Sequence, residues 1–286
     1  MLRNAKHFIY VTVRSHLKKR TTTMVQIFKT DKEKISRLRI EYIESLSEFQ
    51  ELHLELLVEE SAYFIINASE CPIGYFIKTK DNILVEFYLI NEYIPQSHDI
   101  FIKIVREYAI TSTYSKTFDA LLLDCCLLHY TKYKIIGVLF RDFFETDIYP
   151  LDGLSVRTAT ELDYSFLLQQ EDGLYESPEE LTRFVNGGNI SMFIKENELY
   201  GCGYLIKVHE NWDYYDIGMW VNPNSRNQGV ATRIISYLKE LCLKNVWIPI
   251  CACAYGNVAS QKTLEKNGFV SKYKLVEFGI DGNILT

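Results

Sequence analysis

The sequence has little glycine or proline, no C-x-x-C pair and no long apolar run. With 14 glycines and 6 prolines in 286 residues, it does not have the composition of a linker or a low-complexity chain. No apolar stretch approaches the roughly 20 residues of a membrane-spanning helix, so no membrane partner is expected. The chain instead has 48% hydrophobic, 24% charged and 14% aromatic residues, as soluble globular proteins do. Its length suits two domains, each able to bury a core.

Cysteine is present in an odd number, seven. Without a C-x-x-C pair, this indicates reduced thiols in a cytoplasmic protein. Cys251 and Cys253 share one face of a predicted strand and could bind a metal together. Packing is the favoured interpretation, and no metal site is predicted.

Charge is unevenly distributed. Residues 1–23 carry six basic residues and no acidic one, so the rest has 31 − 6 = 25 Lys and Arg against 37 Asp and Glu, a net charge of −12. This balance argues against nucleic acid as a partner. It is weakly compatible with a cationic amine substrate, but a solvated acidic surface is the favoured interpretation. The basic extension could be an organelle transit peptide, but we favour Met24 as the true start, because the domain-like pattern begins there.

The predicted elements fall into two halves, 24–150 and 151–286, with Asp152-Gly153 at the boundary. Each half is predicted as a mixed α/β (α+β) domain with helices on a mostly antiparallel sheet. The first half is predicted to contain strands at 25–28, 63–66, 73–78, 84–90, 121–128 and 134–140, and helices at 32–58 and 97–109. The second half is predicted to contain strands at 154–157, 191–195, 200–208, 214–221, 246–254 and 269–278, and helices at 161–170, 178–185, 230–242 and 257–267.

The halves are related by a repeat at a spacing of about 130 residues. Gly74-Tyr75-Phe76-Ile77-Lys78 matches Gly203-Tyr204-Leu205-Ile206-Lys207. The order of elements agrees as well, which favours duplication. The same spacing puts Pro95 at the position of Arg226, His98 at that of Gly229 and Ile100 at that of Ala231. The first half also offers no counterpart of Asn257 and Ser260 after its predicted strand at 121–128.

The stretch Asn222 to Ala231, N-P-N-S-R-N-Q-G-V-A, follows a strand and opens a helix. Gly229 lets a ligand approach the backbone, and the first N–H groups of the helix lack intrahelical partners. With the helix dipole, these features make a site for an anion, usually phosphate. An ordinary strand–helix connection gives the same local pattern. By the repeat, the first half keeps the fold and is expected to have lost this site.

Two motifs in this region resemble the GNAT superfamily of acyl-CoA-dependent N-acetyltransferases. Arg226-Asn227-Gln228-Gly229-Val230-Ala231 is similar to the family's Gln/Arg-x-x-Gly-x-Gly/Ala signature. Asn257-Val258-Ala259-Ser260, followed by Glu265-Lys266-Asn267-Gly268-Phe269, is similar to its second signature. The close resemblance covers residues 214–269, and it implies two GNAT-like domains, of which the first is degenerate.

The resemblance implies residue roles. The pyrophosphate of acetyl-CoA would lie on the N–H groups of residues 227–231, and the pantetheine arm beside residues 219–221 as an added strand. Asp216 would be the catalytic base, with Asp213 and Glu210 as alternatives, and the N–H of Met219 or Trp220 would stabilise the oxyanion. The residues expected to bind the acyl donor are Met219, Trp220, Val221, Arg226, Asn227, Gln228, Gly229, Val230, Ala231, Asn257 and Ser260.

One position departs from the family pattern. Many members carry a Tyr seven residues after the Asn, as general acid, and here that position is Leu264. Either another hydroxyl protonates the thiolate, with Tyr255 and Ser260 nearby in sequence, or water does, or the domain binds CoA without efficient turnover.

The expected activity is therefore transfer of an acetyl group from acetyl-CoA to a primary amine. Small-molecule amines and protein N-termini or lysines are all possible acceptors. The alternatives are an acyl-CoA-binding sensor without chemistry and a purely structural two-lobed protein. The first half is expected to form a wall of the substrate cleft or to pack against the second. The sequence does not indicate an oligomeric state.

Overall fold

The computed structural model describes residues 25–170, 175 and 177–279. The basic extension predicted at residues 1–23 lies outside the described residues. The N-terminal half contains the elements β1 (Val25–Thr30), α1 (Lys32–Ser45), α2 (Leu52–Glu59), β2 (Ala62–Ala68), β3 (Cys71–Lys78), β4 (Ile83–Leu89), η1 (Asn91–Gln96), α3 (Ser97–Glu107), β5 (Ser112–Lys116), α4 (Ala120–His129), β6 (Lys132–Phe140) and β7 (Asp142–Phe143).

Two predictions in this half are wrong. The single helix at 32–58 is two helices, because the chain becomes extended at Leu46 and stays non-helical to Glu51. Within this break Phe49 stacks on Tyr214 of the other half, with ring centroids 4.0 Å apart. Tertiary contacts therefore compete with helix continuation.

The buried strand predicted at 121–128 is helix α4, and the strand before it is the polar β5. A short apolar run fits a strand or a helix equally well. Asp119 decides the matter, because its carboxylate caps α4 by accepting the Leu122 N–H at 3.2 Å. The position of Asn257 therefore does have a counterpart in the first half, contrary to prediction, and it is occupied by the helix cap Asp119.

The C-terminal half follows the predicted order closely. Its elements are β8 (Ser155–Thr158), η2 (Glu161–Asp163), α5 (Tyr164–Leu168), α6 (Pro178–Asn186), β9 (Ile190–Lys195), β10 (Glu198–His209), β11 (Trp212–Val221), η3 (Pro223–Ser225), α7 (Val230–Lys244), β12 (Ile248–Ala254), α8 (Val258–Lys266), β13 (Phe269–Val270) and β14 (Tyr273–Gly279).

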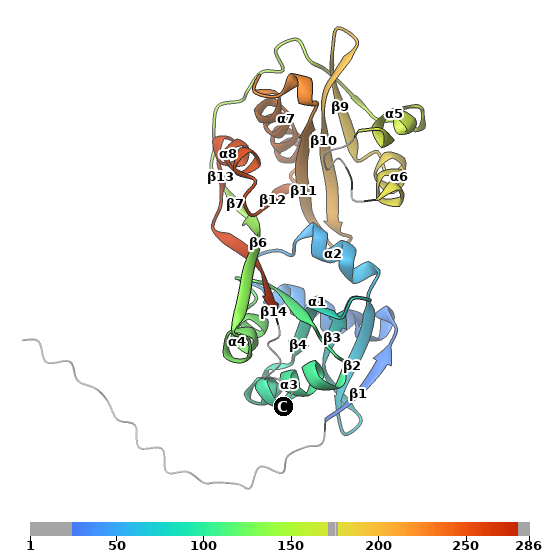
Figure 1. Cartoon of the computed structure of the whole chain (residues 1–286), viewed down its shortest axis with the longest axis vertical. Helices are drawn as coiled ribbons and strands as arrows, with labels where there is room; N and C mark the ends of the chain where they lie inside the picture. The colour runs from blue at the N-terminus through green and yellow to red at the C-terminus, as the bar shows by residue number, and fades with distance from the viewer. Residues whose placement is uncertain (1–24, 171–174, 176, 280–286) are drawn as a thin grey trace, which may run out of the picture.

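The two halves share one twelve-stranded sheet, in the order β1-β2-β3-β4-β5-β14-β6-β12-β11-β10-β9-β8. Strand β14, the last of the chain, pairs with β5 of the N-terminal half. Strand β6 of the N-terminal half pairs with β12 of the C-terminal half, and β6 and β14 pair with each other. Each half thus completes its sheet with a strand from the other, and β6 and β14 join the lobes in Figure 1. The domain boundary near residue 150 remains a prediction from the sequence, because strands of the two halves belong to one continuous sheet.

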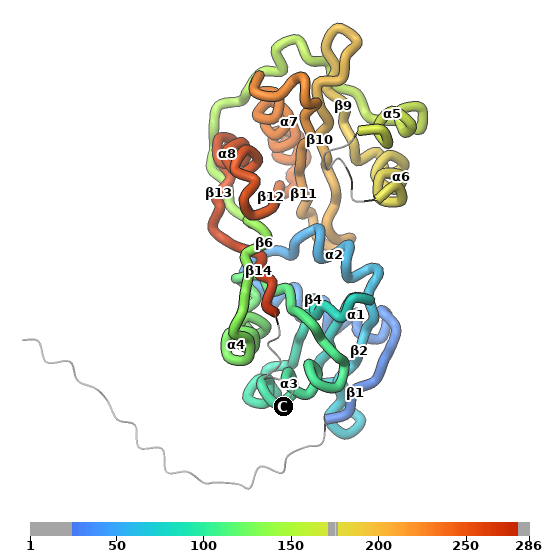
Figure 2. The backbone as a smooth tube through the Cα atoms, viewed as in Figure 1, coloured from blue at the N-terminus to red at the C-terminus, as the bar shows by residue number. Residues whose placement is uncertain are grey.

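A hydrophobic cluster also crosses between the halves. It combines Ile35, Tyr42 and Phe49 with Val208 and Ile250, and Trp212 and Tyr214 pack against it. Figure 2 shows the segment containing α2 passing between the lobes, next to the lower ends of β10 and β11. The N-terminal half is therefore in direct contact with the strands that carry the predicted site.

In the described part of the chain, no helix is both long enough and apolar enough to cross a lipid bilayer. All seven cysteines are unpaired, and five of them are buried.

Candidate functional site

Strands β11 and β12 separate at Asp216. They pair in parallel at Tyr214 with Ile248, at Tyr215 with Pro249 and at Asp216 with Ile250, and no further. Beyond Ile250, β12 pairs on its other side with β6. The last part of β11, residues 217–221, is therefore left with an unpaired edge towards β12.

The alternating direction of the peptide groups along β11 shows which backbone N–H groups lie at that unpaired edge. The Asn222 N–H donates to the Tyr200 carbonyl of β10 at 3.0 Å. Because peptide groups alternate sides along a strand, Trp220 and Gly218 also face β10. The N–H groups of Met219 and Val221 then face the separation. Of the two oxyanion donors considered, Met219 has the suitable orientation.

The loop after β11 and the start of α7 line a groove of about 800 Å³, called here the loop groove. Gly229 is the N-cap of α7, with φ 76°, and Asn227 also has a positive φ, 62°. The first N–H groups of α7 follow this turn, and they have no intrahelical partner. Arg226 and Lys262 line the groove, and no acidic residue within 25–170, 175 and 177–279 does, so the groove suits an anion.

The loop groove contains all but one of the residues predicted to bind the donor. Met219, Trp220, Val221, Arg226, Asn227, Gly229, Val230, Ala231, Asn257 and Ser260 line it. Gln228 does not, because its carbonyl accepts from Arg233 at 2.7 Å and its side-chain amide donates to the Asn224 carbonyl. The Trp220 ring is buried in the cluster beside α5 and α6.

Asn257 has a structural role as well. Its Oδ1 accepts the Ser260 N–H at 3.0 Å and so caps α8. The side chain is exposed at the end of the groove, which leaves its amide nitrogen as the group that could meet a ligand.

A second cavity, of about 440 Å³, lies on the other side of the strand separation and is called here the carboxylate cavity. It is lined by β10, β11, β12 and α8, by α6, and by the start of α2 from the N-terminal half. Glu51, Glu180 and Asp216 line it, and no lysine or arginine does among the residues that the structure describes. The two cavities share Met219, Asn257 and Ser260, so ligands in them would meet at these residues.

Asp216 lies in the wall of the carboxylate cavity. Burial raises the pKa of Asp216 to about 8; the nearby Glu51 carboxylate adds to the rise and the Arg141 guanidinium opposes it. Among the described residues, its carboxylate makes no hydrogen bond or ion pair. The alternatives lie elsewhere: Asp213 is exposed and pairs with Lys207 at 3.2 Å, and Glu210 is exposed in a turn.

The structure narrows the candidates for the group that protonates the leaving thiolate. Leu264 is buried, and Tyr255 is exposed and lines neither cavity. Ser260 lines both. Sequence reasoning missed the carboxylate cavity's residues from α2 and α6, among them Glu51, His53 and Glu180, because no local motif marks residues brought together by packing between distant segments.

The N-terminal half carries a carboxylate at the position of Asp216. Ile77 pairs with Glu86 in β3 and β4, as Ile206 pairs with Asp216 in β10 and β11. Glu86, however, is fully buried and accepts hydrogen bonds from Arg39, Gln50 and Tyr75. Burial alone would raise the pKa of Glu86, but the Arg39 guanidinium and these hydrogen bonds hold it below its usual value.

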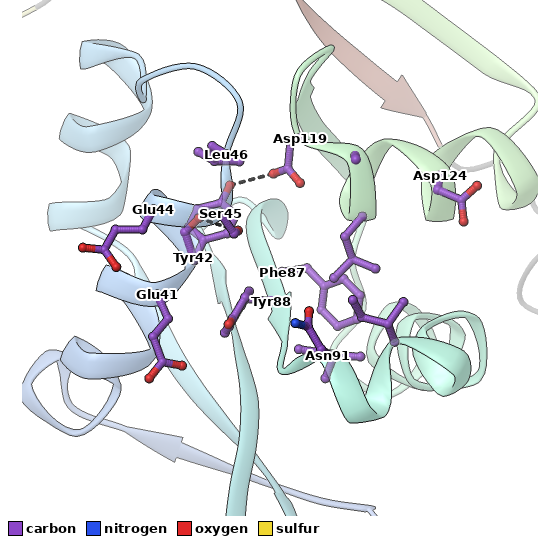
Figure 3. A pocket seen from close by; sticks show the side chains of 14 residues that line it. Glu41, Tyr42, Glu44, Ser45, Leu46, Phe87, Tyr88, Asn91, Asp119 and Asp124 are labelled. Atoms are coloured by element: carbon purple, nitrogen blue, oxygen red, sulfur yellow. Dashed lines mark hydrogen bonds between the residues drawn. The ribbon is translucent and has the colours of Figure 1, made fainter.

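The end of β4 lines a cleft of about 820 Å³, shown in Figure 3. Its acidic lining residues are Glu41, Glu44, Asp119 and Asp124, and among the described residues no lysine or arginine lines it. The start of α3 follows η1 directly, without a residue of positive φ between them. There His98 contacts His129 and Asp124. Both the backbone and the charges of this cleft differ from those of the loop groove.

Comparisons with known proteins agree with this architecture. Residues 31–143 match the family described as acetyltransferase (GNAT) domain, and residues 154–269 match the family described as acetyltransferase (GNAT) family. No curated protein matches the sequence.

Solved structures of the same fold cover most of the chain. An acetyltransferase of the GNAT family from Colwellia psychrerythraea superposes with a TM-score of 0.81 at 18% identity, covering 90% of this chain and 100% of the other. A GCN5-related N-acetyltransferase from Sphaerobacter thermophilus gives 0.60 at 12% identity, covering 90% and 97%. A tandem GNAT protein from the clavulanic acid biosynthesis pathway gives 0.58 at 12% identity, covering 90% and 98%. At these identities the likeness concerns the fold.

The fold and the family matches together show two acetyltransferase domains in one chain. The chain belongs to the GNAT superfamily and carries two GNAT domains in tandem. Among the described residues, no group of three or more His, Cys, Asp and Glu side chains is arranged to hold a metal ion.

Proposed function

We propose that this protein is an acetyl-CoA-dependent N-acetyltransferase with one active site, in residues 151–286, and that its acceptor is a primary amine. The observation that carries the proposal is the meeting of the two cavities at Met219, Asn257 and Ser260. A groove suited to an anion there adjoins a cavity lined by carboxylates. The loop groove thus suits a polyanionic donor, and the adjoining carboxylate cavity suits a cationic acceptor.

In this proposal the donor lies in the loop groove. Its pyrophosphate binds the N–H groups of residues 227–231, helped by the dipole of α7 and by Arg226. The pantetheine arm pairs with the unpaired edge of residues 217–221 as an added strand. The thioester carbonyl then lies near the Met219 N–H, which donates to the oxyanion as it forms.

The acceptor enters the carboxylate cavity as an ammonium ion. Asp216 accepts one of its protons, so an N–H bond breaks and an O–H bond forms at the carboxylate. The freed amine attacks the thioester carbon, a C–N bond forms, and the C–S bond breaks with its electrons on sulfur. The resulting thiolate is protonated by the Ser260 hydroxyl or by water, and the amide nitrogen loses its remaining extra proton to solvent.

The N-terminal half, residues 24–150, contributes a wall of the acceptor site through α2. Its own acidic cleft repels a polyanion, and on this ground we propose that it binds no acyl-CoA. The unpaired cysteines favour a reducing compartment, and we propose a cytoplasmic location. Both small-molecule amines and the amines of proteins fit the proposal, and neither nucleic acid nor a membrane is among the proposed partners.

Calorimetry with acetyl-CoA, followed by thiol release with a panel of amines, tests the proposal. Saturable binding that Arg226→Ala weakens, together with amine-dependent thiol release, is the expected result. Absence of binding at millimolar acetyl-CoA contradicts the proposal and favours a structural role.

A second candidate, an acyl-CoA sensor without chemistry, is favoured by the buried Leu264 at the usual tyrosine position. Tight binding of acetyl-CoA without thiol release above background for any amine identifies that function instead.

A further inference from the structure

The segment between α1 and α2 brings two consecutive polar residues to the equivalent carboxylates of the two halves. Gln50 donates to Glu86 of the N-terminal half at 3.0 Å. Glu51, the next residue, lines the carboxylate cavity beside Asp216 of the C-terminal half. One short segment of the N-terminal half thus reaches both positions.

Glu51 is held firmly where it lies. The residue is 5% exposed, and its Oε2 accepts the Leu54 N–H at 3.0 Å, which caps α2. Asn, Asp and Ser are the preferred residues at such a cap, so capping alone does not explain a buried glutamate. A carboxylate that both lines a cavity and lies near a second carboxylate needs a further reason to be there.

Arg141 joins this segment to the strands of the site. It lies between β6 and β7, and its guanidinium donates to the carbonyl of Phe49 at 2.8 Å and to that of Cys251 at 3.0 Å. Phe49 is two residues before Glu51, and Cys251 follows Ile250, the partner of Asp216. Nη2 of Arg141 is buried without a hydrogen-bond partner among the described residues. Arg141 therefore fixes the spacing of the two carboxylates across the halves.

We propose that Glu51 of the N-terminal half works with Asp216 as one carboxylate pair that receives the acceptor amine, and that Arg141 is the positioning residue of this pair. This inference rests on the proposed function and assigns to the N-terminal half a part in the reaction itself. Electrostatics support it, because after burial Glu51 is the group that raises the pKa of Asp216 most. A stronger base takes a proton from an amine more readily.

Other titratable groups line the same cavity as Asp216 or lie close to its carboxylate, and the effect of the pair has to be separated from theirs experimentally. They are His53 of α2, Tyr175 and Glu180 near α6, Tyr204 of β10, and Cys251 of β12, with Arg141 at the end of β6. A substitution at Glu51 leaves all of these groups in place and changes the charge at residue 51 alone.

Glu51→Asn and Glu51→Asp form a matched pair of variants. Both side chains cap helices well, so α2 is kept in each, and only the aspartate keeps the charge. In the pH profile of kcat/KM, we expect Glu51→Asn to move the acid limb to lower pH by about one unit and to lower the plateau above it. Glu51→Asp should follow the wild-type profile. Glu60→Gln, on the exposed end of the same helix segment, is the control and should leave the profile unchanged.

Identical profiles for Glu51→Asn and Glu51→Asp would overturn the pair while the N-acetyltransferase function stands. If the wild type acetylates no amine, the proposed function fails, and the pair is tested by carbon-13 NMR titration of the Asp216 carboxyl in the free protein. A titration midpoint that falls in Glu51→Asn but not in Glu51→Asp then supports the pair. Equal midpoints overturn it.

Discussion

Glu86 and Asp216 occupy the same position in the two halves, yet their surroundings give them opposite properties. Glu86 is buried in the core and pairs with the Arg39 guanidinium, with Oε1 of Glu86 2.9 Å from Nη2 of Arg39. Asp216 faces a cavity and no cation bonds to it among the described residues. The pKa of Glu86 lies below its usual value and that of Asp216 is about 8. Equivalent strands of the two GNAT domains thus carry a structural ion pair in one half and a candidate base in the other.

Asp216→Asn should lower kcat/KM by about 10²- to 10⁴-fold, the usual contribution of a general base. A base must be ionised to accept a proton, and the pKa of Asp216 is about 8. Wild-type kcat/KM should therefore rise as pH increases through about 8, and this limb should be absent in the variant. Asp213→Asn, on the exposed part of the same strand, serves as control. If the limb is instead lost in Asp213→Asn, Asp213 is the base.

Gly229→Ala should weaken acetyl-CoA binding by about tenfold, because a left-handed φ costs an alanine roughly 1–2 kcal/mol and relaxation of the loop misplaces the N–H groups. Gly153→Ala is the control for the cost of the backbone conformation, since Gly153 also has a positive φ, 84°, and lies outside both cavities. Calorimetry measures both dissociation constants. Equal values for the two variants would show that the backbone at Gly229 does not bind the donor.

The acceptor should be cationic, because the described part of the carboxylate cavity's wall has three carboxylates and no lysine or arginine. For amines of equal length, we expect KM to increase in the order diamine, monoamine, amino acid with a free carboxylate. Added salt should raise KM for the diamine most, since it screens the attraction. Steady-state kinetics with such a series measures the order, and a lower KM for the carboxylate-bearing amine would refute the prediction.

Glu86→Gln should destabilise the fold by about 3–5 kcal/mol, because it removes the charge that compensates the buried Arg39. Urea unfolding monitors the change, and Glu44→Gln on the exposed side of α1 is the control. Acetyl-CoA affinity of the folded variant should equal that of the wild type. A stability equal to that of the wild type would mean that Glu55, which also pairs with Arg39 at 2.6 Å, suffices alone.

Cleavage of the segment between β7 and β8 should leave the halves associated. Strands β6 and β14 are exchanged between the sheets, so the two fragments remain paired through a full set of backbone hydrogen bonds. A protease site inserted near Asp152, followed by size-exclusion chromatography, tests this. The fragments should elute together in buffer and separate only in denaturant, whereas separation in buffer would show that the exchanged strands contribute little.

Local signals in the sequence were sufficient for most elements of the C-terminal half. The alternation along 214–221 and the three- and four-residue spacing after Val230 predicted a strand and a helix that the structure contains. Prediction failed where tertiary contacts decide, as in the break between α1 and α2, and where an apolar run is ambiguous, as in α4.

The sequence by itself determined the loop at residues 226–231, because its glycine and the helix that follows act through the backbone of neighbouring residues. It also determined the tandem GNAT domains, through motifs and a repeat that need no long-range contact. Only the tertiary structure decided that the halves exchange strands and that Glu51 and Arg141 lie beside Asp216. These facts depend on which distant segments pack together. Burial and the neighbouring charges set the pKa of Asp216, and both arise only when those segments have packed.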